Sequence, residues 1–282
     1  MNCVAACLDG ERIVSCSEDR TARVWSTTTG QLLCTFSDHS DSVLCVALFS
    51  NGEMAVSGGG YFDSKVRMWS LSSATELQVF TGHTAGVRGV AVSPDDAIVA
   101  SASKDKTIKL WNIRSGECDA TLTGHTHYVM CVAFNADGQF LASASADKTI
   151  VLWNVRSHSP IRTISDAHTS TVRGVAFSGN WLVSGSEDET VKVWRLQSEN
   201  PIATFTGHTL WVYCVAVFPD GGSRVISGSA DNTVRIWNMR KRVCEHTLSG
   251  RTNSVTSVAM SRDGRMLISG SYDKSVKVWM LR

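Results

Sequence analysis

The chain has 282 residues, of which 43% are hydrophobic and 19% are charged, and its 27 lysines and arginines nearly balance its 26 aspartates and glutamates. This net charge of +1, without a basic run interleaved with aromatic residues, removes any electrostatic argument for a direct nucleic acid partner. No apolar run approaches a membrane span and the N-terminus lacks the features of a secretory signal, so we expect a cytoplasmic or nuclear protein without membrane segments.

Seven similar units, each ending near a tryptophan, occupy the whole chain. The tryptophans are Trp25, Trp69, Trp111, Trp153, Trp194, Trp237 and Trp279, with successive spacings of 44, 42, 42, 41, 43 and 42 residues. A period of roughly 40 to 45 residues built from short strands is typical of four-stranded propeller blades rather than of helical solenoids. Units that contact only their neighbours close into one ring, so we interpret residues 1–282 as a single domain.

In chain order, the first unit predicts strands at residues 3–8, 12–17, 21–26 and 31–36, with a tight turn at Asp9-Gly10. Asp-Gly and Asn-Gly steps supply hairpin turns because these residues accept positive φ at low cost. The cycle then restarts six times, at Asp38-His39, Gly82-His83, Gly124-His125, Ala167-His168, Gly207-His208 and Gly250-Arg251.

The last unit stops at its third strand, three residues after Trp279. Neither terminus supplies a fourth strand, so we expect blade 7 to lack its outer strand. The interpretation that we favour is that the chain is a fragment of a longer protein. The alternative is that a partner donates a strand beside residues 276–280, because an unpaired strand edge is a ready template for β-augmentation.

Each unit carries a similar set of polar residues. An aspartate precedes each repeat tryptophan by six residues, and serines precede it by eight and ten residues in six of the seven units. A histidine begins every unit except the first, which lacks it, and the last, which has Arg251. In a buried site these side chains can satisfy one another's hydrogen bonds. The predicted structural network comprises His39, His83, His125, His168, His208, Asp63, Asp105, Asp147, Asp188, Asp231, Asp273, Trp69, Trp111, Trp153, Trp194, Trp237 and Trp279.

The recurring Gly-His, Ser, Asp and Trp set resembles the WD-repeat β-propeller family over nearly the whole chain. One departure is the residue after each repeat tryptophan, which is Ser, Asn, Arg or Met and never the Asp of the family's name. The resemblance implies an all-β, seven-bladed propeller of four-stranded antiparallel blades. It also implies a non-enzymatic interaction scaffold in a multiprotein complex, which binds peptides or protein loops on the face that carries the His and Asp loops.

Catalysis is the alternative that the Ser, His and Asp side chains suggest, because they are the parts of a hydrolase triad. A nucleophile needs one activated copy in one pocket, whereas this set repeats around a ring. The sequence has no nucleophile elbow and no His, Cys or carboxylate group with metal-ligand spacing. Its nine cysteines are scattered and form no CxxC pair, which indicates reduced thiols. We therefore expect no enzymatic activity, no cofactor and no metal.

Positions that vary among fixed neighbours indicate where a partner binds. Counted from the histidine, positions +4 and +7 are always valine, whereas positions +3 and +5 and the residue before the turn aspartate change from unit to unit. Aromatic residues, Met and Arg are enriched at interface hot spots. The predicted partner-binding residues are Tyr128, Met130, Trp211, Tyr213, Arg88, Arg173, Tyr272, Phe62 and Lys104.

A second functional class is the substrate receptor of a cullin-type ubiquitin ligase. Three segments are similar to the Trp-Asp-x-Arg box of such receptors, with Asn in place of Asp. They are Trp111-Asn112-Ile113-Arg114, Trp153-Asn154-Val155-Arg156 and Trp237-Asn238-Met239-Arg240. An arginine after the third strand also has an ordinary explanation as a solvated loop residue, so the sequence leaves both classes open.

Overall fold

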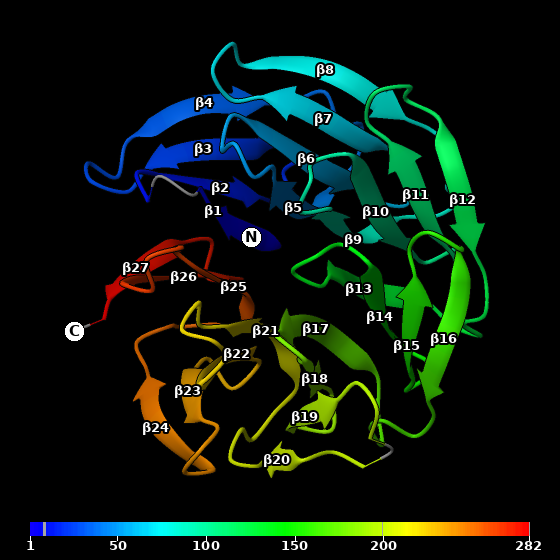
Figure 1. Ribbon diagram of the computed structural model, residues 1–282. Coiled ribbons are helices and arrows are strands. Elements are labelled where there is room, and N and C mark those ends of the chain that lie inside the picture. The colour runs from blue at the N-terminus through cyan, green and yellow to red at the C-terminus, as the bar shows by residue number, and fades with distance from the viewer. Residues whose placement is uncertain (8–9, 199, 282) are drawn as a thin grey trace.

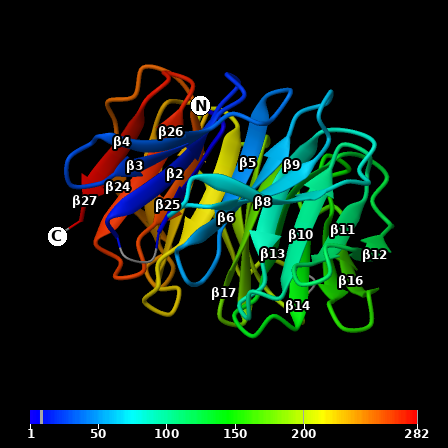
Figure 2. The ribbon, with the colours of Figure 1, turned by 90° about the horizontal axis from the view of Figure 1, so that it is seen from above.

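Seven antiparallel sheets surround a central axis in the computed structural model, which describes residues 1–7, 10–198 and 200–281 (Figure 1). Six sheets have four strands and the last has three, so the predicted fold class, all-β with seven blades of which blade 7 lacks its outer strand, is confirmed. Figure 2 shows the ring from its edge, with strands running between its two faces. Among the described residues, no helix has the length and apolarity needed to span a membrane.

The blades follow one another in chain order, and within each blade the strands run from the axis outward. Blade 1 contains β1 (Cys3–Ala6), β2 (Arg12–Cys16), β3 (Ala22–Ser26) and β4 (Leu32–Phe36), and blade 2 contains β5 (Val43–Leu48), β6 (Met54–Gly59), β7 (Val66–Ser70) and β8 (Thr75–Phe80). Blade 3 contains β9 (Val87–Val92), β10 (Ile98–Ser103), β11 (Ile108–Asn112) and β12 (Cys118–Leu122), and blade 4 contains β13 (Val129–Phe134), β14 (Phe140–Ser145), β15 (Ile150–Asn154) and β16 (Ser159–Ile164). Blade 5 contains β17 (Val172–Ser178), β18 (Trp181–Ser186), β19 (Val191–Arg195) and β20 (Ala203–Phe205), and blade 6 contains β21 (Val212–Val217), β22 (Arg224–Ser229), β23 (Val234–Asn238) and β24 (Val243–Leu248). Blade 7 contains β25 (Val255–Met260), β26 (Met266–Ser271) and β27 (Val276–Met280).

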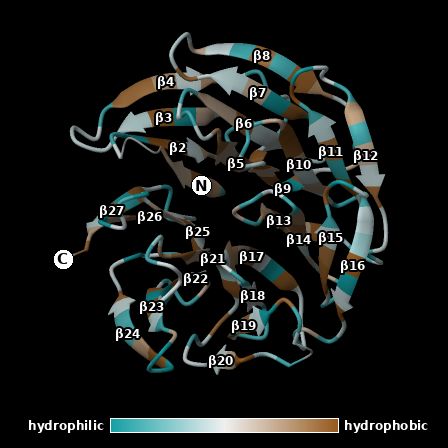
Figure 3. Ribbon diagram, viewed as in Figure 1, coloured by the Kyte–Doolittle hydropathy of each residue, from teal (hydrophilic) through white to brown (hydrophobic). Residues whose placement is uncertain are grey.

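The predicted strand at 3–8 is found as β1, while Leu8 and the predicted turn residue Asp9 lie outside the described residues. The second strand of each blade is buried on both faces because neighbouring blades pack against it, and its small residues allow that close approach. A Cβ on Gly58 of β6 would lie 2.6 Å from Cys45 Sγ and 2.7 Å from Val87 Cγ1 of blade 3. Outer strands such as β8 and β24 carry hydrophilic stretches instead (Figure 3), because one of their edges faces solvent.

Consecutive blades are joined through the repeat tryptophans. The last apolar residue of each outer strand lies over the tryptophan of the next blade, with ring centroids 4.8 Å apart for Phe36 and Trp69 and 5.2 Å apart for Phe205 and Trp237. The tryptophans of blades 2 to 6 are 1–2% exposed as a result. Trp25 of blade 1 is only half-buried.

Blades 1 and 7 close the ring through their inner strands, β1 and β25, which lie side by side (Figure 1). Val4 N donates to Ser257 Oγ at 3.1 Å, and Thr256 Oγ1 donates to Met1 O at 3.1 Å. Val4 also packs against Ile268 in a small apolar cluster. Closure therefore rests on contacts near the axis, and the outer edge of β27 pairs with no described strand.

Candidate functional site

A chain of hydrogen bonds links four side chains in each of blades 2 to 6. In blade 3, Trp111 Nε1 donates to Ser101 Oγ at 2.8 Å, and His83 lies 2.8 Å from Ser101 Oγ through Nε2 and 2.6 Å from Asp105 Oδ2 through Nδ1. The indole can only donate and the carboxylate can only accept, so a neutral histidine protonated on Nδ1 satisfies every group. Burial lowers the pKa of His168 in blade 5, which also favours the neutral form.

The network aspartates are held ionised by their donors. Burial alone would raise the pKa of Asp105, but hydrogen bonds from His83 and Thr107 outweigh it and hold the pKa well below its ordinary value. Thr107 donates to Asp105 Oδ1 from its backbone N at 2.9 Å and from Oγ1 at 2.7 Å. The same balance lowers the pKa of the equivalent carboxylates Asp147, Asp188 and Asp231.

Three blades depart from the common pattern. Blade 2 keeps the bonds of His39 to Asp63 and Ser57 and departs only in spacing, because two extra residues place the serine twelve instead of ten positions before Trp69. In blade 1, Asp19 has no histidine and binds Arg23 at 2.9 Å.

In blade 7, Arg251 takes the place of the histidine. Its Nη1 donates to Asp273 Oδ1 at 3.2 Å, and its Nη2 donates to Ser269 Oγ at 2.7 Å. The predicted set therefore omits Arg251, Trp25 and one serine in each blade. These serines accept from their blade's tryptophan, and Ser269 accepts from Arg251 as well; they are Ser15, Ser57, Ser101, Ser143, Ser184, Ser227 and Ser269. The signal for them was the repeat itself, since Arg251 stands at the histidine position.

The His–Asp bonds bring two sets of loops to one side of the disc, which we call the His/Asp face. Phe62 is 85% exposed there, Trp211 is 45% exposed, and Tyr128 and Tyr272 are each 40% exposed. Tyr61 and Leu210, at 63% and 49% exposed, belong to the same loops and are absent from the predicted set.

The structure brings four of the predicted partner-binding residues into one cluster. The Arg173 guanidinium lies 5.5 Å from the Trp211 ring centroid and 4.9 Å from that of Tyr213, and Tyr213 meets Tyr272 edge-on at 6.4 Å. These are cation–π and edge-to-face contacts, which favour the observed arrangement of the rings.

The other predicted partner-binding residues lie around this cluster. Lys104 Nζ lies 5.8 Å from the Tyr128 ring centroid, and Met130 and Arg88 line the central pocket. Phe62 packs instead against Tyr61, with ring centroids 5.4 Å apart, and does not line that pocket.

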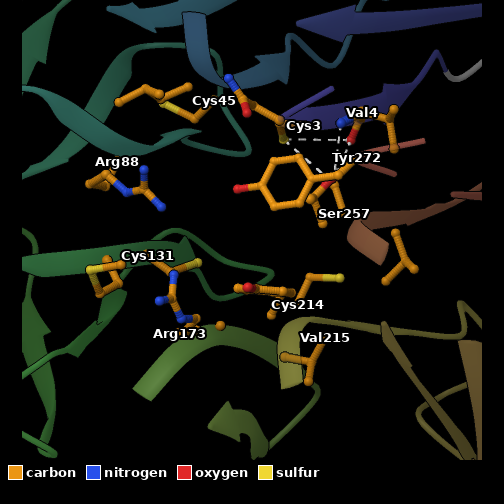
Figure 4. A pocket seen from close by; sticks show the side chains of 17 residues that line it. Cys3, Val4, Cys45, Arg88, Cys131, Arg173, Cys214, Val215, Ser257 and Tyr272 are labelled. Carbon is orange, nitrogen blue, oxygen red and sulfur yellow. Dashed lines mark hydrogen bonds between the residues drawn. The ribbon is translucent and has the colours of Figure 1, made fainter. Parts of the chain in front are cut away.

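A pocket of about 230 Å³ opens at the axis and is lined by Arg88, Met130, Arg173, Tyr213 and Tyr272. Figure 4 shows the guanidinium groups of Arg88 and Arg173 reaching into it beside the Tyr272 ring. The four thiols of Cys3, Cys45, Cys131 and Cys214 also line it. In each of these four repeat units the cysteine directly follows the variable +5 position. The predicted partner-binding set does not include this position.

The pocket thiols differ in acidity. A hydrogen bond from Cys16 lowers the pKa of Cys3 to about 6, whereas burial raises the pKa of Cys131 to about 11. Within the described ranges, no three His, Cys, Asp or Glu side chains are grouped closely enough to hold a metal ion.

The three Trp-Asn-x-Arg segments lie on the opposite face, in turns between third and fourth strands. Asn112 Oδ1 accepts from Ser115 N at 3.1 Å, and Asn154 Oδ1 accepts from Ser157 N at 2.8 Å, so each asparagine caps its own turn. The arginines of these segments, Arg114, Arg156 and Arg240, are exposed. The asparagines therefore have a local structural role.

Comparison with known proteins matches two propeller-type families to most of the chain, leaving residues 27–48 and 281–282 unmatched. Residues 49–243 match the family described as "TEP-1 second beta-propeller", and residues 1–26 and 242–280 match "WD domain, G-beta repeat". The Arabidopsis thaliana protein "Cell division cycle 20.1, cofactor of APC complex" is 37% identical over 90 residues, which are 32% of this chain and 19% of that protein. "Nuclear distribution protein PAC1" of Komagataella phaffii is 34% identical over 83 residues, or 29% of this chain and 16% of that protein.

Human "Striatin-4" is 32% identical over 96 residues, or 33% of this chain and 12% of that protein. The match thus spans less than a fifth of the length of each of these curated relatives. The seven blades, the His–Asp–Ser–Trp hydrogen bonds and the family match over residues 49–243 lead to one assignment. The chain belongs to the WD-repeat β-propeller family.

Proposed function

We propose that this protein is a non-enzymatic interaction platform that binds a peptide or loop of another protein on its His/Asp face. The observation that carries the proposal is the cluster of Arg173, Trp211, Tyr213 and Tyr272, which presents aromatic and cationic groups in mutual contact beside a central pocket. Arg, Trp and Tyr dominate binding energy at protein interfaces. Hydrolysis finds no support in the repeated Ser and His, since Ser101 and its equivalents are 0–2% exposed and already bonded.

Membership of a multiprotein assembly in the cytoplasm or nucleus is part of the same proposal. The names of two similar proteins support this part of the proposal. One is described as a "cofactor of APC complex", and the other, from Caenorhabditis elegans, is "Transcription initiation factor TFIID subunit 5". The near-neutral charge favours protein partners over nucleic acid.

The binding face is tested by removing its side chains without unfolding the ring. The variant Tyr128→Ala/Met130→Ala/Trp211→Ala/Tyr213→Ala should keep the wild-type Tm and lose partners in affinity purification from the source cell. Single hot-spot truncations cost about 2 kcal/mol or more, or roughly 30-fold in affinity.

The matched control removes four exposed apolar side chains from outer strands. Leu32→Ala/Leu33→Ala/Leu77→Ala/Ile161→Ala changes residues that are 47–53% exposed and should retain every partner. Partners kept by the first variant and lost by the control would move the binding site to the outer strands. Recovery of ligase adaptor subunits with the wild-type chain would point to the ubiquitin-ligase receptor instead.

We also propose that the outer edge of β27 accepts an added antiparallel strand. A groove of about 260 Å³ lies beside this edge, lined by Trp25, Ile13, Val276 and Val278. Val278 and Met280 of β27 are 38% and 69% exposed. An unpaired strand edge next to an apolar groove offers both backbone hydrogen bonds and a side-chain pocket to a bound strand.

The six complete blades indicate the sequence of that strand. Each outer strand places a large apolar residue opposite the first residue of the third strand, as in the pairs Val66↔Phe80 and Val191↔Phe205. A threonine precedes this residue in five of the six blades. The strand that fits β27 therefore carries Thr-Phe, Thr-Leu or Thr-Ile, with the apolar residue opposite Val276 and over Trp25.

An eight-residue peptide copied from residues 200–207, which contains Ala203-Thr204-Phe205, should raise the Tm of the protein in a concentration-dependent way. The same peptide with Ser in place of the phenylalanine keeps the backbone and loses the ring that covers Trp25, so its effect should be small. Equal shifts with the two peptides, or no shift with either, would contradict the added-strand proposal.

A further inference from the structure

Arg88 is a cation without a counter-ion. It lines the axial pocket from β9, its Nε is buried without a hydrogen-bond partner, and no described residue forms a salt bridge with it. No aspartate or glutamate lines the pocket. A donor left without a partner is destabilising, so an anion that enters the pocket would supply acceptors that the described chain does not give this guanidinium.

The same position in blade 5 shows how such an arginine is satisfied within the chain. Arg173 Nη2 lies 2.5 Å from Glu187 Oε1, and its Nε donates to the same oxygen at 2.8 Å. Glu187 immediately precedes the turn aspartate of its blade, and the residue at that position in blade 3 is Lys104. Blade 3 therefore has a second cation where blade 5 has the counter-ion.

Each cation of blade 3 has another positive charge near it. Burial and the charge of Arg173 lower the pKa of Arg88, and burial and the charge of Arg88 lower the pKa of Lys104. Lys104 is positioned over the Tyr128 ring, and no carboxylate in the described chain pairs with it. Around the pocket mouth, Arg88, Lys104 and Arg173 are thus accompanied by one carboxylate of this set, Glu187. The set therefore has a surplus of positive charge.

We propose that Arg88 and Lys104 bind an anionic side chain, a carboxylate or a phosphoryl group, of the peptide segment that docks on the His/Asp face. This inference rests on the proposed function and adds the chemistry of the segment it binds. In blade 3 the anion lies beside Arg88 in the way that Glu187 lies beside Arg173 in blade 5. The guanidinium forms charge-assisted hydrogen bonds to the anion, and the ammonium contributes a second charge.

The test begins with a phage-displayed library of random 12-residue peptides selected on the wild-type protein. We expect the selected peptides to share an Asp or Glu at one position and to lose binding to Trp211→Ala/Tyr213→Ala. The selected peptide is then made with Glu, Gln or phosphoserine at that position, and its Kd is measured calorimetrically against the wild type, Arg88→Met and Lys104→Glu. Arg114→Met, an exposed arginine on the opposite face, is the control.

Gln in the peptide, or Met at position 88, should each weaken binding about 10- to 100-fold, and the two changes together should be no worse than one. Lys104→Glu supplies the internal counter-ion that blade 5 has, so it should weaken binding while keeping or raising the Tm. Stronger binding of phosphoserine than of Glu assigns the site to a phosphoryl group, and the reverse assigns it to a carboxylate.

Two outcomes separate this inference from the proposed function. Peptides that depend on Trp211 and Tyr213 but bind equally with Glu, Gln and phosphoserine would overturn the anion site and leave the binding face standing. Failure to select any peptide that depends on those rings would overturn both.

Discussion

Replacement of Trp153 by alanine should lower the free energy of unfolding by about 3 to 5 kcal/mol, the range for large aromatic side chains truncated in a core. The side chain is 1% exposed and packs in one cluster with Leu122 of the preceding blade. Its Nε1 donates to Ser143 Oγ at 2.8 Å, and that hydroxyl also bonds to His125. The change therefore leaves a cavity and removes one partner from a buried polar chain.

The chain contains a matched control for this experiment. Trp25 makes the equivalent bond to Ser15 at 2.7 Å, but it is half-buried because no outer strand lies over it. Trp25→Ala should therefore cost clearly less than Trp153→Ala when the two are compared by urea denaturation followed by circular dichroism. If the two substitutions lowered the free energy of unfolding equally, the hydrogen bond to serine, and not burial under the neighbouring blade, would account for the stabilisation by these tryptophans.

Acid should unfold the protein steeply, because four buried carboxylates titrate together. Despite burial, hydrogen bonds from histidine and threonine lower the pKa of Asp105, Asp147, Asp188 and Asp231 in the folded state. In the unfolded chain these groups titrate near the ordinary pKa of about 3.9. Below that pH the unfolded state binds protons that the folded state does not, so the stability present above it is lost as the pH falls.

Each such carboxylate contributes a slope of about 1.4 kcal/mol per pH unit, and four contribute about 5 kcal/mol per pH unit between their unfolded and folded pKa values. His168 acts in the same direction, because burial lowers its folded pKa and its contribution is lost as the pH falls below about 6.5. Urea denaturation at pH values from 7 down to 2, with the free energy taken from the midpoint and the m-value, measures the slope below the unfolded pKa.

Asp188→Asn should reduce the acid slope by about the share of one carboxylate, while Asp119→Asn, on the exposed outer strand β12, should leave it unchanged. A slope that Asp188→Asn does not alter would show that the His168–Asp188 bond does not govern acid stability.

The fold could be predicted because the chain serves as its own alignment. The nearly regular spacing of seven tryptophans from Trp25 to Trp279 predicted the number of blades, and the lack of a fourth strand after Trp279 predicted the three-stranded blade. The repeat period shows which residues of the seven units are equivalent. Equivalent residues adopt the same local structure in a repeat fold, so the period was enough to predict the architecture.

Pairing between equivalent positions could not be predicted in the same way. The sequence marked Arg88, Lys104, Arg173 and Glu187 as variable positions, but which of them meet depends on the twist of each blade and on the side-chain rotamers. Arg251 illustrates the same limit, since the sequence shows that it stands at the histidine position but not that its two Nη groups reach both Asp273 and Ser269. Geometry at the His/Asp face therefore had to come from the structure.

The order in which the tryptophans are covered has a consequence for biosynthesis. Trp69 is covered by Phe36, Trp111 by Phe80 and Trp237 by Phe205, so each cover precedes its tryptophan in the chain. The N-terminal segment leaves the ribosome first, and in repeat proteins folding can start at one repeat and propagate to its neighbours. Each newly made blade thus meets a surface that is already assembled, and the ring can grow one blade at a time from blade 1 while the later blades are still being translated.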